Sequence, residues 1–451
     1  MSEQVDVIVI GMGPGGEDVG GKLAEAGLEV VGIEASLVGG ECPYWGCIPS
    51  KMMIRAANLL AEGRRIPGIA GTSTVEPDWE PVATRIKEQA TDDWDDTVAV
   101  DRFVGKGGRF VRGRGALVGP KRVQVGDTIY EARKGVVLAT GTTAAVPPIE
   151  GLNTVEYWTN HEIIKTKEVP ASLVVLGAGA IGAELTQVMA RFGAKVTIVE
   201  AADRLVPLEE PEAGELLAEV FRAEGIDVRV GLMANHVAQD GPEIAVTLSD
   251  GSVVKGERLL VATGRRTNLA DLGLDTVGID PGSRFLDADE HMVLQNGLWA
   301  VGDIVGQGAF THVALYQSAI AVANILGEDN PGADYRALSR VTFSDPEIGS
   351  VGITEAQARE QGLPVAVALQ NVAHTARGWL HGTGNEGLIK LVVDTDADIV
   401  VGATSAGPHG GEVLGLLSLA VHAKISTAQM RQMIFAYPTF HKGIEDALRQ
   451  L

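Results

Sequence analysis

The feature that most constrains how this chain can fold is a strand–helix–strand pattern that occurs twice. Each copy starts with a short run of β-branched apolar residues, passes through a glycine-rich turn into a stretch with helical spacing, and ends in a second apolar run. The first copy covers residues 5–33 and the second covers residues 173–199. The two copies predict two βαβ units, each with parallel strands joined by a crossover helix, and therefore an α/β protein.

The glycine-rich turn of each copy matches GxGxxG, an arrangement that lets a strand turn sharply into a helix beside a pyrophosphate. The matching residues are Gly11, Gly13 and Gly16 in the first copy and Gly177, Gly179 and Gly182 in the second. Backbone amides at the start of the following helix stabilise the phosphate charge. The turns therefore predict two dinucleotide sites, although bare GxGxxG matches are common and the alternative of one vestigial site stays open.

An acidic residue ends the second strand of each copy, where a dinucleotide site needs a carboxylate for the ribose hydroxyls. These residues are Glu34 and Glu200. A carboxylate at Glu200 can bond a 2'-hydroxyl and repels a 2'-phosphate, so the second site is predicted to prefer NADH over NADPH, although Arg204 nearby leaves some room for the phosphate. The alternative is that Glu200 only caps its strand.

The two cysteines of the chain lie close together in Gly39-Gly-Glu-Cys-Pro-Tyr-Trp-Gly-Cys-Ile-Pro-Ser-Lys51. Cys42 and Cys47 are five positions apart and precede a helical stretch at residues 50–62, so a disulfide between them can close over one turn. A helix N-terminus favours the thiolate, the reactive form in disulfide exchange, and the segment therefore predicts a redox-active pair. The rivals are a metal site, which two sulfurs alone do not complete, and two unreactive buried thiols.

The composition limits the classes of partner. The 451 residues carry a formal net charge of -22, which disfavours binding to nucleic acid or to an anionic membrane surface. No uninterrupted apolar stretch is long enough to span a bilayer, and the N-terminus leads into a strand without a signal peptide, so a cytoplasmic location is expected. The length calls for two or three domains.

The pattern along the chain changes near residue 341. From there, alternating strands are followed by helical stretches, which predicts a separate α+β module. Earlier in the chain, an acidic stretch with tryptophans at residues 78–101 is interpreted as a solvated amphipathic helix rather than as a binding feature.

With these residues in hand, the chain resembles the pyridine-nucleotide-disulfide oxidoreductases, the group that contains lipoamide dehydrogenase, glutathione reductase and mercuric reductase. The likeness spans nearly the whole length. It rests on GMGPGG from Gly11, the CxxxxCxPSK segment that ends at Lys51, Ala139-Thr140-Gly141, GAGAIGAE that ends at Glu184, Ala262-Thr263-Gly264-Arg265, Gly302-Asp303 and Tyr437-Pro438-Thr439.

The resemblance implies two Rossmann-like domains and a C-terminal α+β dimerisation domain. Residues 1–150 and 267–340 would bind FAD in the first dinucleotide site, residues 151–266 would bind NAD(P)H, and residues 341–451 would form a homodimer interface. Asp303 would contact the ribityl and phosphate part of FAD. The remaining cofactor-binding residues are expected to be Thr140, Gly141, Gly264, Arg265 and Gly302.

The resemblance also implies roles for the reactive residues. Cys42 would be the outer thiol that attacks the substrate, and Cys47 the thiol against the isoalloxazine that takes electrons from reduced flavin. Lys51 and Glu184 match an ion pair near flavin N5 that favours the anionic reduced ring. The expected reaction passes electrons from NADH through FAD to the Cys42–Cys47 disulfide and on to a disulfide or another small acceptor.

Two positions depart from the family pattern. The family's disulfide reductases have a histidine where this chain has Tyr437 and a glutamate where it has Lys442, and that pair moves the proton of the substrate thiol. His441 and Glu445 are at helical spacing, but a surface pair without function is the preferred interpretation. Tyr437 either donates a proton or packs at the dimer interface, and its bond to Pro438 is a candidate for the cis form.

This departure leaves three hypotheses for the acceptor side. The first is the dithiol route described above. In the second, the flavin reduces a quinone or another small oxidant directly, as in a diaphorase; a mercuric-reductase-like activity is related, since Tyr437 and Lys51-Met-Met-Ile-Arg-Ala-Ala resemble that enzyme, but the chain has no further cysteines to receive mercury. In the third, the protein is a flavin-bound subunit of a larger complex without turnover of its own.

Overall fold

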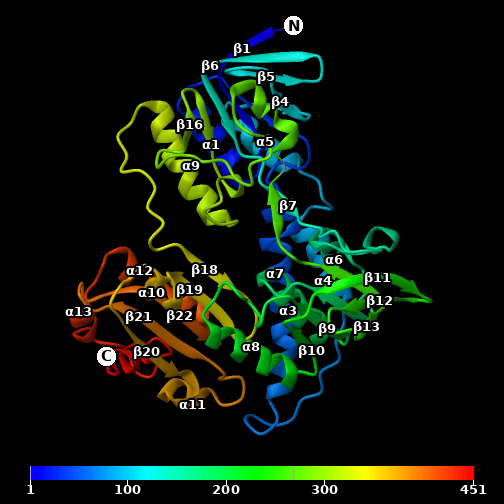
Figure 1. Ribbon diagram of the computed structural model, residues 1–451, viewed down its shortest axis with the longest axis vertical. Helices are drawn as coiled ribbons and strands as arrows, with labels where there is room; N and C mark the ends of the chain where they lie inside the picture. The colour runs from blue at the N-terminus through cyan, green and yellow to red at the C-terminus, as the bar shows by residue number, and fades with distance from the viewer. Residues whose placement is uncertain (1, 268) are drawn as a thin grey trace. The chain divides into compact units, whose positions relative to one another are not determined.

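The computed structural model describes residues 2–267 and 269–451 (Figure 1). The chain divides into two compact units. The first contains Met1–Pro49, Thr84–Ala144 and Arg265–Asp334, and the second contains Ser50–Ala83, Ala145–Gly264 and Tyr335–Leu451. Within the described residues, no helix combines the length and the apolar character needed to cross a lipid bilayer.

The first unit is built on an eight-stranded sheet. Its strands are β1 (Ser2–Ile10), β2 (Val30–Glu34), β3 (Arg109–Arg112), β4 (Gly115–Leu117), β5 (Arg122–Val125), β6 (Thr128–Leu138), β16 (Val293–Gln295) and β17 (Leu298–Ala300). Their order is β16-β17-β6-β1-β2-β3, with β4 and β5 attached to β6 as an antiparallel ribbon. The central strands β17, β6, β1, β2 and β3 run parallel, as the first βαβ pattern predicts.

Both faces of this sheet are covered, which explains why its strands read as continuous apolar runs. On β1, Val7 and Val9 pack on one face, while Ile8 and Ile10 pack on the other. The helices on the Val7 face are α1 (Pro14–Glu25), α5 (Thr97–Gly105) and α9 (Thr311–Leu326). A short antiparallel pair, β7 (Thr142–Ala144) with β15 (Arg265–Thr267), also belongs to this unit.

The second unit contains the second predicted βαβ pattern. A parallel sheet has the order β10-β9-β8-β14, and it is accompanied by an antiparallel sheet of β11, β12 and β13. The bounds are β8 (Ser172–Leu176), α7 (Ala180–Arg191), β9 (Lys195–Glu200), α8 (Pro211–Ala223), β10 (Asp227–Val230), β11 (Ala234–Asp240), β12 (Glu243–Leu248), β13 (Val253–Gly256) and β14 (Arg258–Val261). Helices α3 (Cys47–Arg65) and α6 (Asn160–Lys165) are also largely or wholly in this unit.

The C-terminal part of the second unit is the predicted α+β module. Its antiparallel sheet has the order β18-β19-β22-β21-β20, and α12 packs across β19 and β22 with Leu414 and Leu417 in the core (Figure 1). The bounds are β18 (Ser339–Thr342), β19 (Glu347–Gly352), α10 (Glu355–Glu360), β20 (Val365–Asn371), α11 (Ala376–His381), β21 (Leu388–Asp394), β22 (Ile399–Gly407), α12 (Gly410–His422), α13 (Thr427–Arg431) and α14 (Lys442–Leu448).

The prediction of one amphipathic helix at residues 78–101 is wrong. The segment contains α4 (Glu80–Arg85), a π-helical turn η1 (Ile86–Ala90), a left-handed turn, and then the start of α5 at Thr97. The helix is interrupted because side chains of the turn bond to a distant segment near residues 38–45. Such a long-range requirement leaves no mark in helical periodicity.

Candidate active site

The first glycine-rich turn, between β1 and α1, has the geometry of a phosphate-binding turn. Gly11 has a φ of +91°, and a Cβ there would lie 2.4 Å from the carbonyl oxygen of Ala139; a Cβ on Gly16 would lie 1.9 Å from the carbonyl oxygen of Gly11. Both positions therefore require glycine. At Gly13 the nearest atom to a Cβ is Gly40 Cα at 4.0 Å, so the space beside it is open. A ligand can approach the backbone at Gly13.

The second turn, between β8 and α7, repeats this geometry. Gly177 has a φ of +96°, and its Cβ would lie 2.5 Å from the carbonyl oxygen of Ala262. A Cβ on Gly182 would lie 1.9 Å from the carbonyl oxygen of Gly177, while nothing lies within 4 Å of one on Gly179. Both turns thus keep tight contacts at their first and third glycines and open space at the second, which is the requirement for a pyrophosphate.

The two strand-end carboxylates, Glu34 and Glu200, brace these turns. Glu34 accepts hydrogen bonds from the backbone amides of Met12 (2.7 Å) and Ser36 (2.7 Å). Glu200 accepts the equivalent bonds from Ala178 (2.6 Å) and from the amide two residues beyond it (2.9 Å). The carboxylates are therefore held at the turn's edge, where a bound ribose would meet them.

Two of the predicted cofactor-binding residues, Asp303 and Arg265, are connected by hydrogen bonds through Thr142. Asp303 accepts a hydrogen bond from the Thr142 hydroxyl at 2.5 Å, and that hydroxyl accepts one from Nε of Arg265 at 2.7 Å. Arg265 also pairs with Glu41 at 3.1 Å. The Ala-Thr-Gly turn and the Gly302-Asp303 turn are thereby held together at the carboxyl ends of parallel strands, where α/β sheets bind ligands.

These residues fit a flavin dinucleotide. The hydroxyl oxygen of Thr140 is buried and has no hydrogen-bond partner among the described residues, and a Cβ on Gly141 would meet nothing within 4 Å. An unsatisfied buried hydroxyl beside open backbone is expected where a polar ligand completes the site. Gly302 has a φ of +84° and donates its amide to Gln317 at 2.6 Å, which fixes the neighbouring Asp303.

Cys47, the second of the two cysteines, lies beside the N-termini of two helices, α3 and α9. Cys42 is on α2 (Glu41–Trp45) and is partly buried, and Cys47 is the exposed first residue of α3. The Sγ of Cys47 lies 3.5 Å from the hydroxyl oxygen of Thr311, which begins the 16-residue helix α9. Cys47 is therefore close to the positive ends of two helices, and this position favours a thiolate.

The structure also brings together Lys51 and Glu184. Lys51 Nζ lies 2.8 Å from a Glu184 carboxylate oxygen and 4.8 Å from the centroid of the Phe343 ring. Glu184 is almost fully buried, and its other oxygen accepts the backbone amide of Phe343 at 2.9 Å. The Lys51 ammonium group is thus held by one oxygen of the Glu184 carboxylate, while the other oxygen is fixed by the backbone of Phe343.

This ion pair is the end of a longer polar network that sequence analysis missed. On α7, Gln187 bonds both the amide and the carbonyl of Asp345, and Arg191 pairs with the Asp345 carboxylate at 2.7 Å. On α3, Asn58 bonds Arg191 and Arg65 pairs with Asp345 at 2.7 Å. The spacing of these residues on α3 and α7 places them on one face of each helix, but the sequence does not indicate that both faces meet residues 343–345.

Burial by itself raises the pKa of Asp345, but the guanidinium groups of Arg191 and Arg65 outweigh it, so the pKa lies below its usual value of 3.8. The carboxylate therefore stabilises the fold fully above about pH 4, and the contribution is lost as the pH falls through the lowered pKa. Asp345→Asn is expected to lower the free energy of unfolding at pH 7 by about 2 kcal/mol, because the buried Arg191 loses one of its two carboxylate partners and keeps only Glu224, while Arg65 keeps Glu62.

Urea unfolding of Asp345→Asn between pH 3 and pH 7 measures this effect. The variant is expected to lose less stability than the parent on the acid side, because the group that titrates is gone. Asp396→Asn, at an exposed position, is the control and is expected to stay within about 0.5 kcal/mol of the parent. Equal losses in the two variants would contradict the prediction.

The C-terminal motif Tyr437-Pro438-Thr439 lies at the surface of the single chain. Tyr437 is 72% exposed in the single chain, and its bond to Pro438 is cis, as predicted. Glu445 pairs with Lys442 and, at 2.6 Å, with Arg449, so its observed partners do not include His441. The interpretation of Glu445 as part of a surface cluster is consistent with this pairing.

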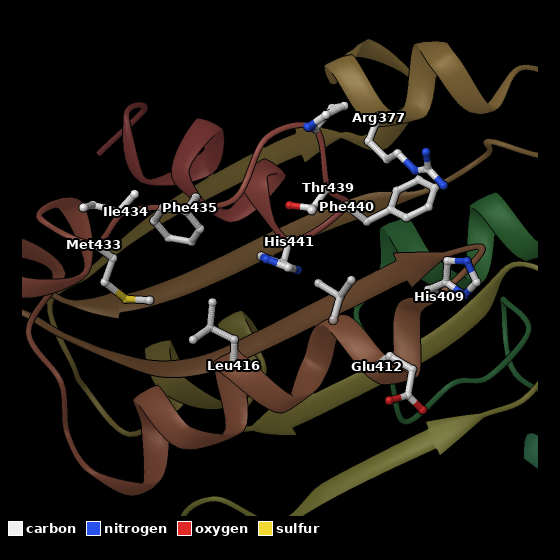
Figure 2. A pocket seen from close by; sticks show the side chains of 12 residues that line it. Arg377, His409, Glu412, Leu416, Met433, Ile434, Phe435, Thr439, Phe440 and His441 are labelled. Atoms are coloured by element: carbon white, nitrogen blue, oxygen red, sulfur yellow. The ribbon is translucent and has the colours of Figure 1, made fainter.

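A cavity of about 620 Å³ lies beside this motif. Figure 2 shows His409 and Glu412 toward one end of it and Met433 and Ile434 toward the other, with His441 between them. Ile434 is fully exposed in the single chain. The cavity is therefore part of an apolar surface next to Tyr437 in the α+β module.

Comparisons with known proteins agree with this architecture. The family described as pyridine nucleotide-disulphide oxidoreductase matches residues 5–320, and its dimerisation domain matches residues 338–448. A mercuric reductase from Staphylococcus aureus is 31% identical over 449 residues, which is 98% of this chain and 81% of that protein. A dihydrolipoyl dehydrogenase from Chlorobaculum tepidum is 31% identical over 457 residues, which is 99% of this chain and 97% of that protein.

Solved structures give the same result. The Cu(II) complex of the HOCl-induced flavoprotein disulfide reductase RclA from Escherichia coli has a TM-score of 0.87 and 26% identity, covering 98% of this chain and 99% of that one. LpdA from Mycobacterium tuberculosis has a TM-score of 0.86 and 26% identity, covering 99% of each chain. This protein therefore belongs to the pyridine nucleotide-disulphide oxidoreductase family, FAD-dependent enzymes that use NAD(P)H, and its C-terminal part is the dimerisation domain of that family.

Proposed function

We propose that the protein transfers electrons from NADH through FAD to a disulfide formed by Cys42 and Cys47, and from there to a disulfide or another small acceptor. The observation that carries the proposal is the position of Cys47 at the start of α3, with its sulfur 3.5 Å from the first residue of α9. A thiolate needs such an environment to act in exchange at neutral pH. A purely structural cysteine does not.

FAD, when bound, would supply the two electrons of NADH to the sulfurs of Cys42 and Cys47. Reduction breaks the bond between Cys42 and Cys47 and leaves one thiol and one thiolate. The Cys42 thiolate attacks an acceptor disulfide, forms a mixed disulfide and expels the first product thiolate. Cys47 then attacks Cys42, releases the second product and restores the original bond, so that one acceptor disulfide is reduced to two thiols for each NADH consumed.

Further residues around the cysteines and the two dinucleotide turns have proposed roles. The buried carboxylate of Glu184 fixes the Lys51 ammonium, whose positive charge favours the anionic reduced flavin, as the family resemblance implies. Asp303 holds the ribityl and phosphate part of FAD, with Thr140, Gly141, Gly302 and Arg265 around it, and Gly264 belongs to the second site. Tyr437 takes the place of the family's proton-transferring histidine, and its exposure in the single chain supports a role toward an acceptor bound by the partner subunit.

The acceptor itself is proposed to be a disulfide or another small electrophile. The dihydrolipoyl dehydrogenases and the flavoprotein disulfide reductase among the relatives support a sulfur acceptor, and the mercuric reductases support a soft metal ion. Tyr437 and Lys442 in place of the histidine and glutamate favour a second candidate, direct reduction of a quinone by the flavin. A flavoprotein subunit without turnover is the third.

Anaerobic titration with NADH tests the proposal. Because both FAD and the Cys42–Cys47 disulfide accept two electrons, the protein is expected to take up four electrons and to develop a long-wavelength thiolate-to-flavin absorption band after the first two. Uptake of only two electrons without that band would rule out the dithiol route and support direct reduction by the flavin. Failure to reduce the flavin at all would support the third hypothesis.

We also propose that NADH is the preferred reductant. Glu200 carries a negative charge at the second turn, where a 2'-phosphate would be repelled. The parent is expected to have a kcat/KM for NADH at least about tenfold above that for NADPH, and Glu200→Gln is expected to remove most of that difference because it keeps an acceptor oxygen and loses the charge. Glu34→Gln at the equivalent position of the first turn is the control, and it should leave the ratio unchanged.

The domain boundaries are proposed as residues 1–150 with 267–340 for FAD, 151–266 for NAD(P)H and 341–451 for the interface. The dimerisation domain supports a homodimer. A cytoplasmic location is supported by the need for NADH and for a compartment in which a dithiol can cycle.

A further inference from the structure

The segment that follows η1 adopts an unfavourable backbone conformation. Asp92, Asp93 and Trp94 have φ angles of 49°, 55° and 59°, so three successive residues with side chains are in the left-handed region. The turn is closed by hydrogen bonds from the amide of Asp93 to the carbonyl of Lys87 (2.6 Å) and from the amide of Asp95 to that of Asp92 (3.1 Å). Such a turn persists only where the surrounding structure holds it.

Its contacts are with the segment that carries the cysteines. The indole ring of Trp94 stacks on that of Trp45, with centroids 5.7 Å apart and an interplanar angle of 25°. The indole nitrogen of Trp94 donates a hydrogen bond to the carbonyl oxygen of Tyr44 at 3.3 Å. Tyr44 and Trp45 lie between Cys42 and Cys47 in the chain, so Trp94 holds the two middle residues of the CxxxxC segment.

A second contact fixes the start of the same segment. Asp96 is buried and accepts the backbone amide of Val38 at 2.7 Å, and Arg112 pairs with the same carboxylate oxygen at 2.5 Å. Val38 precedes the two glycines that lead into α2. The left-handed turn and the residue two positions after it therefore contact residues 38–45 at two places: Asp96 bonds Val38 at the start, and Trp94 contacts the residues between the cysteines.

We propose that Trp94 is a positioning residue for the redox pair, which holds residues 44–45 so that the sulfurs of Cys42 and Cys47 can join. The inference rests on the proposed function, since it assigns Trp94 a role in the dithiol couple. Disulfide bonds form only within a narrow range of Cα separation and side-chain direction. A segment held in a fixed conformation loses less freedom on closing than a mobile one, so Trp94 favours the disulfide over the dithiol.

The test measures the equilibrium between disulfide and dithiol directly in the purified flavoprotein. The protein is equilibrated with dithiothreitol buffers of known ratio, its thiols are alkylated, and the Cys42–Cys47 disulfide is quantified by mass spectrometry. Trp94→Ala is expected to shift the equilibrium about tenfold toward the dithiol, which corresponds to a potential about 30 mV more positive for a two-electron couple. Trp94→Phe keeps a stacking ring but loses the donor, so a smaller shift in the same direction is expected.

The control is Trp79→Ala, because Trp79 makes the same kinds of contact elsewhere. Its indole nitrogen donates a hydrogen bond to the carbonyl oxygen of Thr166 at 3.0 Å. Its ring makes an edge-to-face contact with the ring of Phe192, with centroids 4.9 Å apart. The inference is wrong if Trp79→Ala shifts the couple as much as Trp94→Ala, or if both Trp94 variants stay within twofold of the parent. If the parent forms no reversible Cys42–Cys47 disulfide, the proposed function fails as well; a normal parent couple with unshifted Trp94 variants overturns only the role of Trp94.

Discussion

Cys47→Ser is expected to lower the rate of NADH-dependent reduction of a small disulfide, such as 5,5'-dithiobis(2-nitrobenzoate), by about a thousandfold or more. Serine cannot form the disulfide that links the flavin to the acceptor, and no other cysteine besides Cys42 is present in the chain. Steady-state kinetics under anaerobic conditions measure the loss. This is the largest effect that the dithiol route predicts.

Ferricyanide supplies the internal control for this variant. It takes electrons singly from reduced flavin without a thiol, so Cys47→Ser should retain most of the parent's NADH–ferricyanide activity. Cys42→Ser should lose disulfide reduction in the same way. Turnover of the disulfide by Cys47→Ser at a rate close to the parent's would show that electrons leave the flavin directly, and the quinone-type hypothesis would replace the dithiol route.

The second large effect is expected at the first glycine turn. Gly16→Ala places a Cβ 1.9 Å from the carbonyl oxygen of Gly11, so α1 cannot keep its distance from β1. We expect a loss of about 3 kcal/mol or more in the free energy of unfolding, at the upper end of overpacking costs, together with loss of FAD. Chemical unfolding and the ratio of FAD to protein after purification measure the two effects.

Gly13→Ala is the matched variant that separates ligand binding from folding. The backbone at Gly13 has a φ of -68°, which alanine adopts readily, and the nearest atom to its Cβ is 4.0 Å away. The apoprotein should therefore stay within about 1 kcal/mol of the parent, while the methyl group occupies the space that a pyrophosphate needs. Recovery of Gly13→Ala with a full complement of FAD would contradict the assignment of this turn. Gly179→Ala should instead keep FAD and raise the KM for NADH.

The part of the site that could be predicted from the sequence is the part that depends on local backbone geometry. The glycine turns were predictable because their requirements are local: the φ at Gly11 and the closeness of Gly16 to Gly11 depend on residues a few positions apart. The strand-end acids followed for the same reason, since the length of a βαβ unit fixes where Glu34 and Glu200 fall. The pairing of Lys51 with Glu184 was expected only from the family resemblance, because 133 positions separate them.

By itself, the sequence determined the two βαβ units, the places of their glycines and strand-end acids, and the α+β character of the C-terminal module. The tertiary structure alone decided which polar side chains meet, as Asp345 meets Arg191 and Arg65, and where helical periodicity is interrupted so that Trp94 can stack on Trp45. The physical reason is the separation along the chain of the residues that interact. Backbone conformation and apolar periodicity are set by neighbours along the chain, whereas buried ion pairs and ring stacks depend on packing between segments far apart in sequence.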